Sequence, residues 1–334
     1  MRHIAELEAR VARLEARVNL AATEPDAAPA SPIELTAVAG RTEDELEFEV
    51  GQNWFAKVGI AVLTLGAIFM MSLPYASLPA AVPSLIGGAL AIGLFALARM
   101  WRQSFELVSG HLRGVAMALF YFATLRLYFF GTRHVLATDT FIGRAALVAV
   151  VALNLVLAYR RKSPWLVGLA LVLGHVTAVA VGAGSFLLPA VVVLAALAVA
   201  GALKNNWPGL ALAGIPLGYA TYFAWAGNDP FLCRPFQFVA GPSVAPGFVL
   251  VVAVILAAGP LLRRDHRVED GLTNTSALLN CALGYGVFFL HTLARHGTIF
   301  APAHLAASLV FLGLAVAFWV RERSHVSTFL YAMT

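Results

Sequence analysis

The chain has 334 residues, of which 60% are hydrophobic and only 12% are charged, and its mean hydropathy is +0.80. A soluble domain has roughly a quarter of its residues charged, so this composition excludes an ordinary soluble protein and indicates a membrane protein. The formal net charge is +5, but no basic run is interleaved with aromatic residues, so we expect no nucleic acid among the partners.

Residues 1–20 predict a short cytoplasmic coiled-coil arm. Apolar residues recur there at spacings of three and four, as at the a and d positions of a heptad. They are Ile4, Leu7, Val11, Leu14 and Val18. In this register Arg10 and Glu15 can pair between parallel chains, which predicts a homo-oligomer through residues 4–18. Two heptads are marginal in water, so a solvated amphipathic helix is the alternative.

Residues 21–50 predict a linker that is first rich in Ala and Pro and then acidic. The stretch AATEPDAAPASP has no means of burying a core. The acidic stretch TEDELEFEV then leads into the first apolar run. We therefore expect these residues to connect the arm to the membrane.

Residues 51–334 predict an all-α, polytopic transmembrane helix bundle. A bilayer requires about 20 apolar residues per helix, and about ten runs of the sequence fit this length. The predicted spans are 54–73, 79–98, 114–131, 141–159, 164–182, 186–203, 208–226, 247–262, 272–294 and 302–320. The sequence ends in VSTFLYAMT as though another span were beginning, which leaves open whether the membrane domain is complete.

The distribution of basic residues predicts the orientation of these spans. With the amino terminus in the cytoplasm, the inner loops and span ends carry Arg99, Arg102, Arg113, Arg160, Arg161, Lys162, Lys204, Arg263, Arg264, Arg267, Arg321 and Arg323. The outer loops carry only Arg133, Arg234 and Arg295. Lys and Arg concentrate on the cytoplasmic side, so the alternation supports both the orientation and the number of spans, and we expect the chain in the cytoplasmic (inner) membrane with its amino terminus in the cytoplasm.

The stretch EVGQNWFAKVGIAVLTLGAIFMM follows a predicted coiled coil and a Pro/Ala linker. In this opening the chain resembles a family of bacterial multipass membrane proteins known as domain of unknown function 2339. Members open with a short coiled coil and a first helix led in by Gly and Trp, followed by many Ala/Leu/Gly helices. The resemblance implies a multipass protein of the bacterial inner membrane, and it implies no activity.

No Asp or Glu lies inside the ten predicted spans. Proton relays and cation sites in membranes usually depend on buried carboxylates, so this absence disfavours an ion-coupled transporter. It also disfavours paired-carboxylate hydrolysis and a metal site within the spans. The two cysteines, Cys233 and Cys281, indicate neither a disulfide framework nor a metal cluster. We therefore expect no cofactor, no metal and no catalytic residue among the spans.

Four basic residues fall in the outer half of the predicted spans: Arg126, Arg144, His175 and His291. Cations without intramembrane anions form a candidate cluster for an anionic ligand, such as a lipid phosphate or a prenyl-phosphate-linked sugar. The alternative is that the arginines reach toward the headgroups and the histidines make structural hydrogen bonds. His291 shares a helix face with Asn280 and Gly284, and we expect that face to point into the bundle.

Small residues in two predicted spans bear on packing and mechanism. Ala170, Gly174, Ala178 and Gly182 lie four residues apart, and we interpret them as a contact within the bundle. Gly214, Pro216 and Gly218 predict a kink or break in the seventh span, with the kink favoured. The long connection at 227–246 predicts either a lid over the basic cluster or a simple link.

Three roles agree with these features. We favour a non-enzymatic membrane scaffold or interaction protein that uses the amino-terminal arm. The first alternative is a carrier or flippase-like protein for an anionic or lipid-linked substrate. The second is an enzyme acting on a lipid-linked substrate at the outer membrane face, which the missing acid–base pair disfavours.

Overall fold

A computed structural model gives the structure of the chain. It describes residues 56–73, 75, 78–103, 106–130, 135–228, 234–239, 241–263, 270–321 and 324–334. The predicted coiled-coil arm at 1–20 and the linker at 21–50 lie outside these residues, so both stay predictions. The chain divides into the compact units Met1–Gly59 and Ile60–Thr334, and the second contains nearly all that follows.

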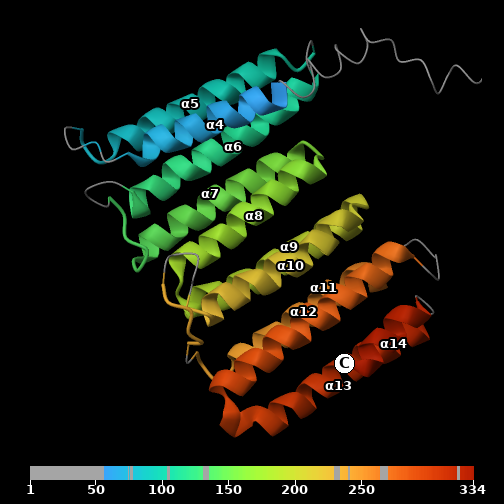
Figure 1. Cartoon of the computed structure of the whole chain (residues 1–334). Coiled ribbons are helices and arrows are strands. Elements are labelled where there is room, and N and C mark those ends of the chain that lie inside the picture. The colour runs from blue at the N-terminus through green and yellow to red at the C-terminus, as the bar shows by residue number, and fades with distance from the viewer. Residues whose placement is uncertain are drawn as a thin grey trace, which may run out of the picture. The chain divides into compact units, whose positions relative to one another are not determined.

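The described residues form α-helices joined by short connections, with one 3-10 turn and no strand among them. Figure 1 shows the helices, which are α4 (Ala56–Ser72), α5 (Val82–Met100), α6 (Glu106–Phe129), α7 (Phe141–Arg160), α8 (Pro164–Val181), α9 (Gly184–Asn205), α10 (Pro208–Ala226), α11 (Ala245–Leu262), α12 (Gly271–Arg295), η3 (Gly297–Ile299), α13 (Phe300–Val320) and α14 (His325–Met333). The predicted all-α class is therefore confirmed for this part of the chain.

Eight of these helices are long and apolar enough to cross a membrane, namely α5 to α9 and α11 to α13. The other two predicted spans coincide with α4, which has 17 residues, and with α10, which has 19. The ten-span count therefore stays a prediction. The span predicted at 114–131 lies mostly within α6, which begins earlier, at Glu106, because its polar first turns continue the helix beyond the apolar run.

Short polar side chains determine where several helices begin. Thr140 Oγ1 accepts a hydrogen bond from Gly143 N, and Ser163 Oγ accepts one from Leu166 N. These side chains satisfy amide groups of the first helical turn that have no partner within the helix. At the other end of α8, Gly182 has a φ of 66°, a conformation that glycine adopts without the cost a side chain would add.

Successive helices run in opposite directions and lie side by side in Figure 1. Their ends consequently meet at two ends of the bundle. We call the first the loop end; there α8, α10 and α12 finish and α9, α11 and α13 begin. The described parts of the connection between α10 and α11, residues 227–228, 234–239 and 241–244, lie at this end. We call the other the basic end; there α5, α7 and α9 finish and α6, α8 and α10 begin.

Small residues bring neighbouring helices close together. Ala170 and Ala178 on α8 are fully buried, and a Cβ atom on Gly174 would lie only 2.6 Å from Leu194 Cδ2 on α9. Without a hydrophobic drive between helices in lipid, such close packing supplies much of the association energy. The small-residue stripe therefore contributes to packing within the bundle, as the sequence predicts.

The seventh predicted span is not broken at its glycines and proline. α10 runs from Pro208 to Ala226 as one helix with Pro216 inside it, so the break alternative finds no support, and the favoured kink stays a prediction. The two glycines serve packing instead. A Cβ atom on Gly214 would lie 3.0 Å from the Ala198 Cβ on α9, and one on Gly218 would lie 3.7 Å from Val252 Cγ1 on α11.

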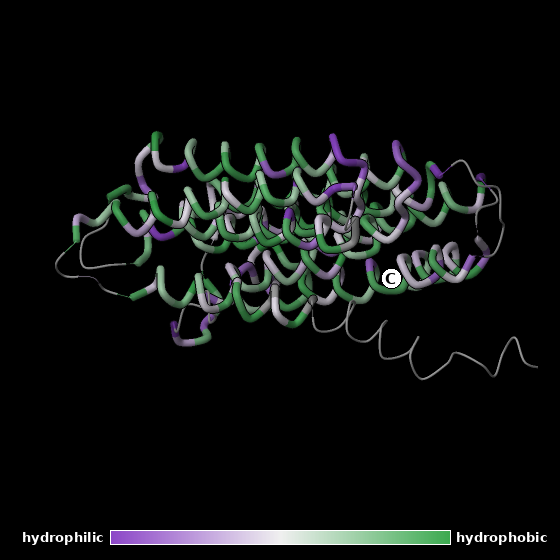
Figure 2. The backbone as a smooth tube through the Cα atoms, turned by 90° about the horizontal axis from the view of Figure 1, so that it is seen from above, coloured by the Kyte–Doolittle hydropathy of each residue, from purple (hydrophilic) through white to green (hydrophobic). Residues whose placement is uncertain are grey.

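Large apolar side chains cover the outside of the helices. Leu85 is 70% exposed and Trp319 is 66% exposed. In Figure 2 hydrophobic colour runs along the helices, and hydrophilic segments gather mainly near their ends and connections. In water such surfaces would cost free energy, whereas lipid chains solvate them. A lipid bilayer is therefore the environment that this surface fits.

Candidate functional site

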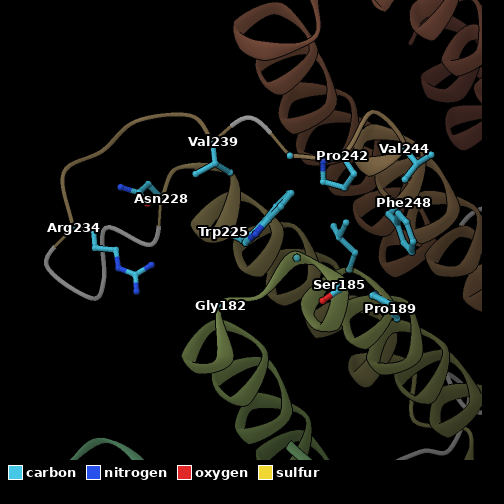
Figure 3. A pocket seen from close by; sticks show the side chains of 13 residues that line it. Gly182, Ser185, Pro189, Trp225, Asn228, Arg234, Val239, Pro242, Val244 and Phe248 are labelled. Atoms are coloured by element: carbon cyan, nitrogen blue, oxygen red, sulfur yellow. The ribbon is translucent and has the colours of Figure 1, made fainter. Parts of the chain in front are cut away.

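The connection after α10 folds back over the end of that helix. Val239 N donates a hydrogen bond to Ala226 O at 2.8 Å, and Gln237 N donates one to Gly227 O at 3.3 Å. The Asn228 side chain donates from Nδ2 to Pro235 O at 3.2 Å. The described part of this connection is therefore attached to the bundle, as Figure 3 shows.

A cleft of about 600 Å³ lies beside this connection at the loop end. It is enclosed by the end of α8, the first turns of α9, the last turn of α10, the connection and the start of α11 (Figure 3). Its lining residues are Gly182, Gly184, Ser185, Leu188, Pro189, Trp225, Asn228, Arg234, Val239, Gly241, Pro242, Val244 and Phe248. The walls are mainly apolar, and their polar side chains include the Arg234 guanidinium, the Asn228 amide and the Ser185 hydroxyl.

Trp225 forms the central wall of the cleft and is only 6% exposed. Its indole ring lies between two glycines. A Cβ atom on Gly184 would come within 2.9 Å of Trp225 Cζ2, and one on Gly241 would come within 2.6 Å of Cη2. The absence of side chains at these two positions therefore makes the space that the indole occupies.

His291 on α12 contacts Trp225 and the residues around it. Its Nδ1 is hydrogen-bonded to Tyr222 Oη at 2.7 Å, and its Nε2 lies 3.4 Å from Val239 O. Its ring stacks on Phe238 at 6.3 Å and meets Trp225 edge-on at 5.9 Å. His291 thus joins α10, α12 and the connection, and it is completely buried.

His175 occupies a separate place between α8 and α10. It is 4% exposed, and its Nδ1 is hydrogen-bonded to Thr221 Oγ1 at 2.9 Å. A neutral imidazole with one hydroxyl partner suits the interior of a bundle in lipid, where an unpaired polar group is costly.

Arg126 and Arg144 contact other residues than the two histidines do. Arg126 is 3% exposed; its Nη2 donates to Leu73 O at 3.1 Å, and its guanidinium carbon lies 6.0 Å from the Tyr75 ring. Within the described residues, its Nε and Nη1 have no hydrogen-bond partner. Arg144 is half-buried and donates from Nε to Thr138 O at 2.8 Å.

The four predicted cationic residues therefore have four different sets of contacts. None of them lines the cleft, and no hydrogen bond or ring contact among the described residues joins any two of them. His291 approaches the cleft through Trp225, whereas Arg126 contacts the end of α4. Arg133 and His134 lie outside the described residues. A single anionic-ligand cluster made of these four residues stays a prediction.

Other residues form the cleft, and the sequence offers only a partial signal for them. The basic-residue pattern predicts Arg234 in an outer loop, and in the structure its side chain is exposed at the rim of the cleft. Trp225 and Phe248 lie at span ends, where aromatic residues are common, so nothing distinguishes them from interfacial anchors. The contact of Gly184 and Gly241 with Trp225 depends on tertiary structure, which spacing does not reveal.

His296 follows α12 outside the membrane-crossing helices and touches His291, with ring centroids 4.9 Å apart. The side chain is 8% exposed, and burial lowers the pKa of its imidazole below the usual value of 6.5. Among the described residues, no group of three or more His, Cys, Asp or Glu side chains could hold a metal ion.

Eight apolar helices in one chain define the class, which is a multipass integral membrane protein. No protein-family model matches the chain, and neither a curated protein nor a solved structure matches it. Any more specific role must therefore come from the cleft and its surroundings.

Proposed function

We propose that this membrane protein binds an anionic ligand with an apolar portion in the loop-end cleft and acts as a carrier for it. The observation that carries the proposal is the pairing, in one cleft, of the apolar walls Trp225 and Phe248 with the guanidinium of Arg234. A lipid-linked phosphate or a prenyl-phosphate-linked sugar has this combination of charge and apolar chain.

The dimensions and position of the cleft agree with such a ligand. Small-molecule sites commonly occupy 300–1,000 Å³ and combine apolar walls with a few polar groups, and this cleft has about 600 Å³. Arg234 is exposed at the rim, where a phosphate at the membrane surface would meet it in a charge-assisted hydrogen bond. The chain of the ligand would then contact α9 and α11.

We place the loop end on the outer side of the cytoplasmic membrane and the amino terminus in the cytoplasm. The support is the concentration of basic residues at the basic end, which positive-inside orientation puts in the cytoplasm. The described ones are Arg99, Arg102, Arg113, Arg160, Arg161, Lys162, Lys204, Arg263 and Arg321. A reporter fused after Lys162 should be active only as a cytoplasmic enzyme; activity outside the cell would contradict this orientation.

Binding of a short-chain polyprenyl phosphate to the purified full chain in neutral detergent tests the proposal. Val244 lines the cleft and is 62% exposed, so Val244→Trp should fill the cleft without disturbing the core. We expect at least about a tenfold loss of affinity, since this variant removes most of the apolar contact. The control is Val251→Trp on α11, the helix that Val244 precedes, because Val251 is 47% exposed and lies outside the cleft.

The charge requirement is tested with the matching polyprenol, which lacks the phosphate, and with Arg234→Gln. Both should weaken binding about tenfold or more, because a hydrogen bond to a charged group is lost. Equal binding of the phosphate and the alcohol would contradict the proposal. Recovery of the probe unchanged would support a carrier, whereas a cleaved or transferred phosphate would favour the enzyme alternative.

The scaffold hypothesis depends on the heptad pattern at residues 4–18 and stays a second proposal. Deletion of residues 2–20 should reduce the size of the complex on a native gel if the arm assembles the protein. An unchanged size would eliminate the arm as an assembly element. The binding test above does not require the arm, so the two proposals can fail separately.

A further inference from the structure

A second cleft, of about 400 Å³, lies at the basic end among α5, α6, α7 and α8. Its apolar lining includes Phe95, Met117 and Leu166. Three arginines, Arg99, Arg113 and Arg161, also line it. It is distinct from the loop-end cleft. Leu166 at the start of α8 and Gly182 at its end are separated by 16 residues, which is about 24 Å along a helix.

The arginines come from three different helix segments. Arg99 lies in the last turn of α5, and Arg161 caps the end of α7. Arg113 lies on α6, where it is half-buried and donates from Nη2 to Ala98 O at 3.2 Å. Three positive charges around one opening repel one another, and an anion placed among them relieves that repulsion.

Two of these guanidinium groups are open to an external partner. Arg99 and Arg161 are exposed, and neither has a hydrogen bond or an ion pair from its side chain within the described residues. An ion pair among the described residues, Arg263 with Asp270 at 2.9 Å, lies elsewhere, at the start of α12. The charge complementarity of the cleft therefore favours an anionic partner.

The depth of the cleft distinguishes a lipid from a soluble anion. The spans of α5 and α7 end at Met100 and Arg160, so Arg99 and Arg161 lie at the membrane boundary. Arg113 lies five residues inside the α6 span, which is about 7.5 Å at 1.5 Å per residue. The apolar part of the cleft continues from there into the depth of the acyl chains.

We infer that this cleft binds an anionic phospholipid from the adjacent leaflet. The headgroup phosphate lies between Arg99, Arg113 and Arg161, and one acyl chain lies against Phe95 and Met117. Guanidinium groups pair with phosphate through charge-assisted and often bidentate hydrogen bonds, and basic pockets between transmembrane helices suit lipid headgroups. The inference is independent of the proposed function, because the two clefts share no residue.

The test titrates the purified full chain in neutral detergent with a fluorescent phosphatidylglycerol, and in parallel with the same label on phosphatidylcholine. The test variant carries Arg99→Gln and Arg161→Gln; the control variant carries Arg102→Gln and Lys162→Gln. All four side chains are exposed near the same end, and both variants lose two positive charges, but only the first pair lines the cleft. Exposure of these residues keeps the effect on folding small.

We expect the test variant to bind phosphatidylglycerol at least about tenfold more weakly, and the control to change less than about twofold. Phosphatidylcholine should bind wild type at least about tenfold more weakly than phosphatidylglycerol. Equal losses in the two variants would overturn the proposal, because the arginines would then act only as general surface charge. No loss in either variant would overturn it as well.

Two further measurements distinguish a lipid ligand from a soluble anion. Ala96 lines the cleft and is exposed, so Ala96→Trp should block the acyl chain and weaken phosphatidylglycerol binding about tenfold. Ala89→Trp, exposed on the same helix outside the cleft, is its control. Displacement of the bound lipid by inorganic phosphate alone, or full binding to Ala96→Trp, would show that the site takes a soluble anion and would overturn the lipid assignment.

Discussion

The hydrogen bonding of buried polar side chains differs between helices α4 to α7 and helices α8 to α12. In the second group the buried residues Tyr219, Tyr222, Thr221, His175, His291 and Asn280 are hydrogen-bonded to one another in pairs across helices. In the first group Ser109 and Tyr128 donate instead to backbone carbonyls of neighbouring helices, and Tyr121 pairs with Thr177 on α8. Ser84 Oγ, both amide atoms of Asn154 and two nitrogens of Arg126 are buried there without a partner among the described residues, and Asn205 Nδ2 is such an atom in the second group.

The difference indicates which helices are held together by specific contacts. A hydrogen bond between side chains on two helices fixes their relative position, because breaking it leaves polar groups unpaired in an apolar medium. Helices α8, α10 and α12 are joined in this way. In α5, α6 and α7 the described bonds between helices run from a side chain to a backbone carbonyl, as from Ser109 Oγ to Ala98 O and from Tyr128 Oη to Gly143 O. The arginine-rich cleft lies among these helices and the start of α8.

The largest expected effect is the loss of Asn280, whose side chain makes three buried hydrogen bonds. Its Oδ1 accepts from Tyr219 Oη at 2.6 Å, and its Nδ2 donates to Ala253 O at 2.9 Å and to Tyr331 Oη at 3.0 Å. Asn280→Leu leaves these groups buried and unpaired. We expect the free energy of unfolding, measured by SDS titration of the detergent-solubilised protein, to fall by about 2–4 kcal/mol.

Asn154→Leu is the matched control for that measurement. Asn154 is fully buried on α7, but neither amide atom has a described partner, so its replacement by an apolar side chain of similar volume removes an uncompensated cost. Unfolding should become harder or stay within about 0.5 kcal/mol of wild type. Equal destabilisation by the two variants would remove the distinction between the two groups of helices.

The second expected effect concerns how tightly the hydrogen-bonded group is packed. A Cβ atom on Gly284 would lie 2.7 Å from Tyr219 Oη and 3.0 Å from Cζ, so Gly284→Ala must displace the ring that is bonded to Asn280. A cost of about 1–3 kcal/mol is typical of such overpacking. Thermal unfolding followed by circular dichroism would measure it.

Gly88→Ala on α5 supplies the comparison in the first group of helices. Nothing lies within 4 Å of the position of its Cβ atom, and alanine favours the helix over glycine. This variant should be neutral or stabilising by up to about 1 kcal/mol. If Gly284→Ala were as harmless as Gly88→Ala, the contact between α10 and α12 would be looser than the structure describes.

The sequence predicts the helices well and the site poorly, for identifiable physical reasons. Apolar runs locate α5, α7, α8 and α9 because burial in lipid requires a near-continuous apolar segment of fixed length. The face of α12 that carries Asn280, Gly284 and His291 is also predicted, because helical periodicity determines which residues share a face. All three residues are buried, which confirms that part of the prediction.

Tertiary contacts explain what the sequence does not predict. The anionic-ligand hypothesis groups Arg126, Arg144, His175 and His291 by depth in the membrane, but depth does not determine which helices are neighbours. His175 meets Thr221 because α8 packs on α10, and Arg126 reaches Leu73 because α6 packs near the end of α4. α10 continues through Pro216 as one helix packed against α8, α9, α11 and α12, and the sequence around Pro216 does not reveal these neighbours.

The smallest expected effect is a pH dependence from His296, beside the loop-end network. Burial lowers the pKa of its imidazole in the folded protein below the unfolded value of about 6.5, so below pH 6.5 the unfolded chain binds more protons than the folded one. Stability should therefore decrease as the pH falls below about 6.5, and should recover as the pH rises. The groups facing His296 are His291, at 4.9 Å between ring centroids, and the adjacent Arg295.

His296→Gln keeps a polar side chain of similar size and removes this titration. The difference in unfolding free energy between wild type and variant, measured from pH 8 to pH 5, isolates His296 from the other histidines because they are present in both proteins. Wild type should lose more stability than the variant over that range. Parallel curves would mean that the imidazole is already solvated, and that the 8% exposed side chain does not remain enclosed beside His291 in solution.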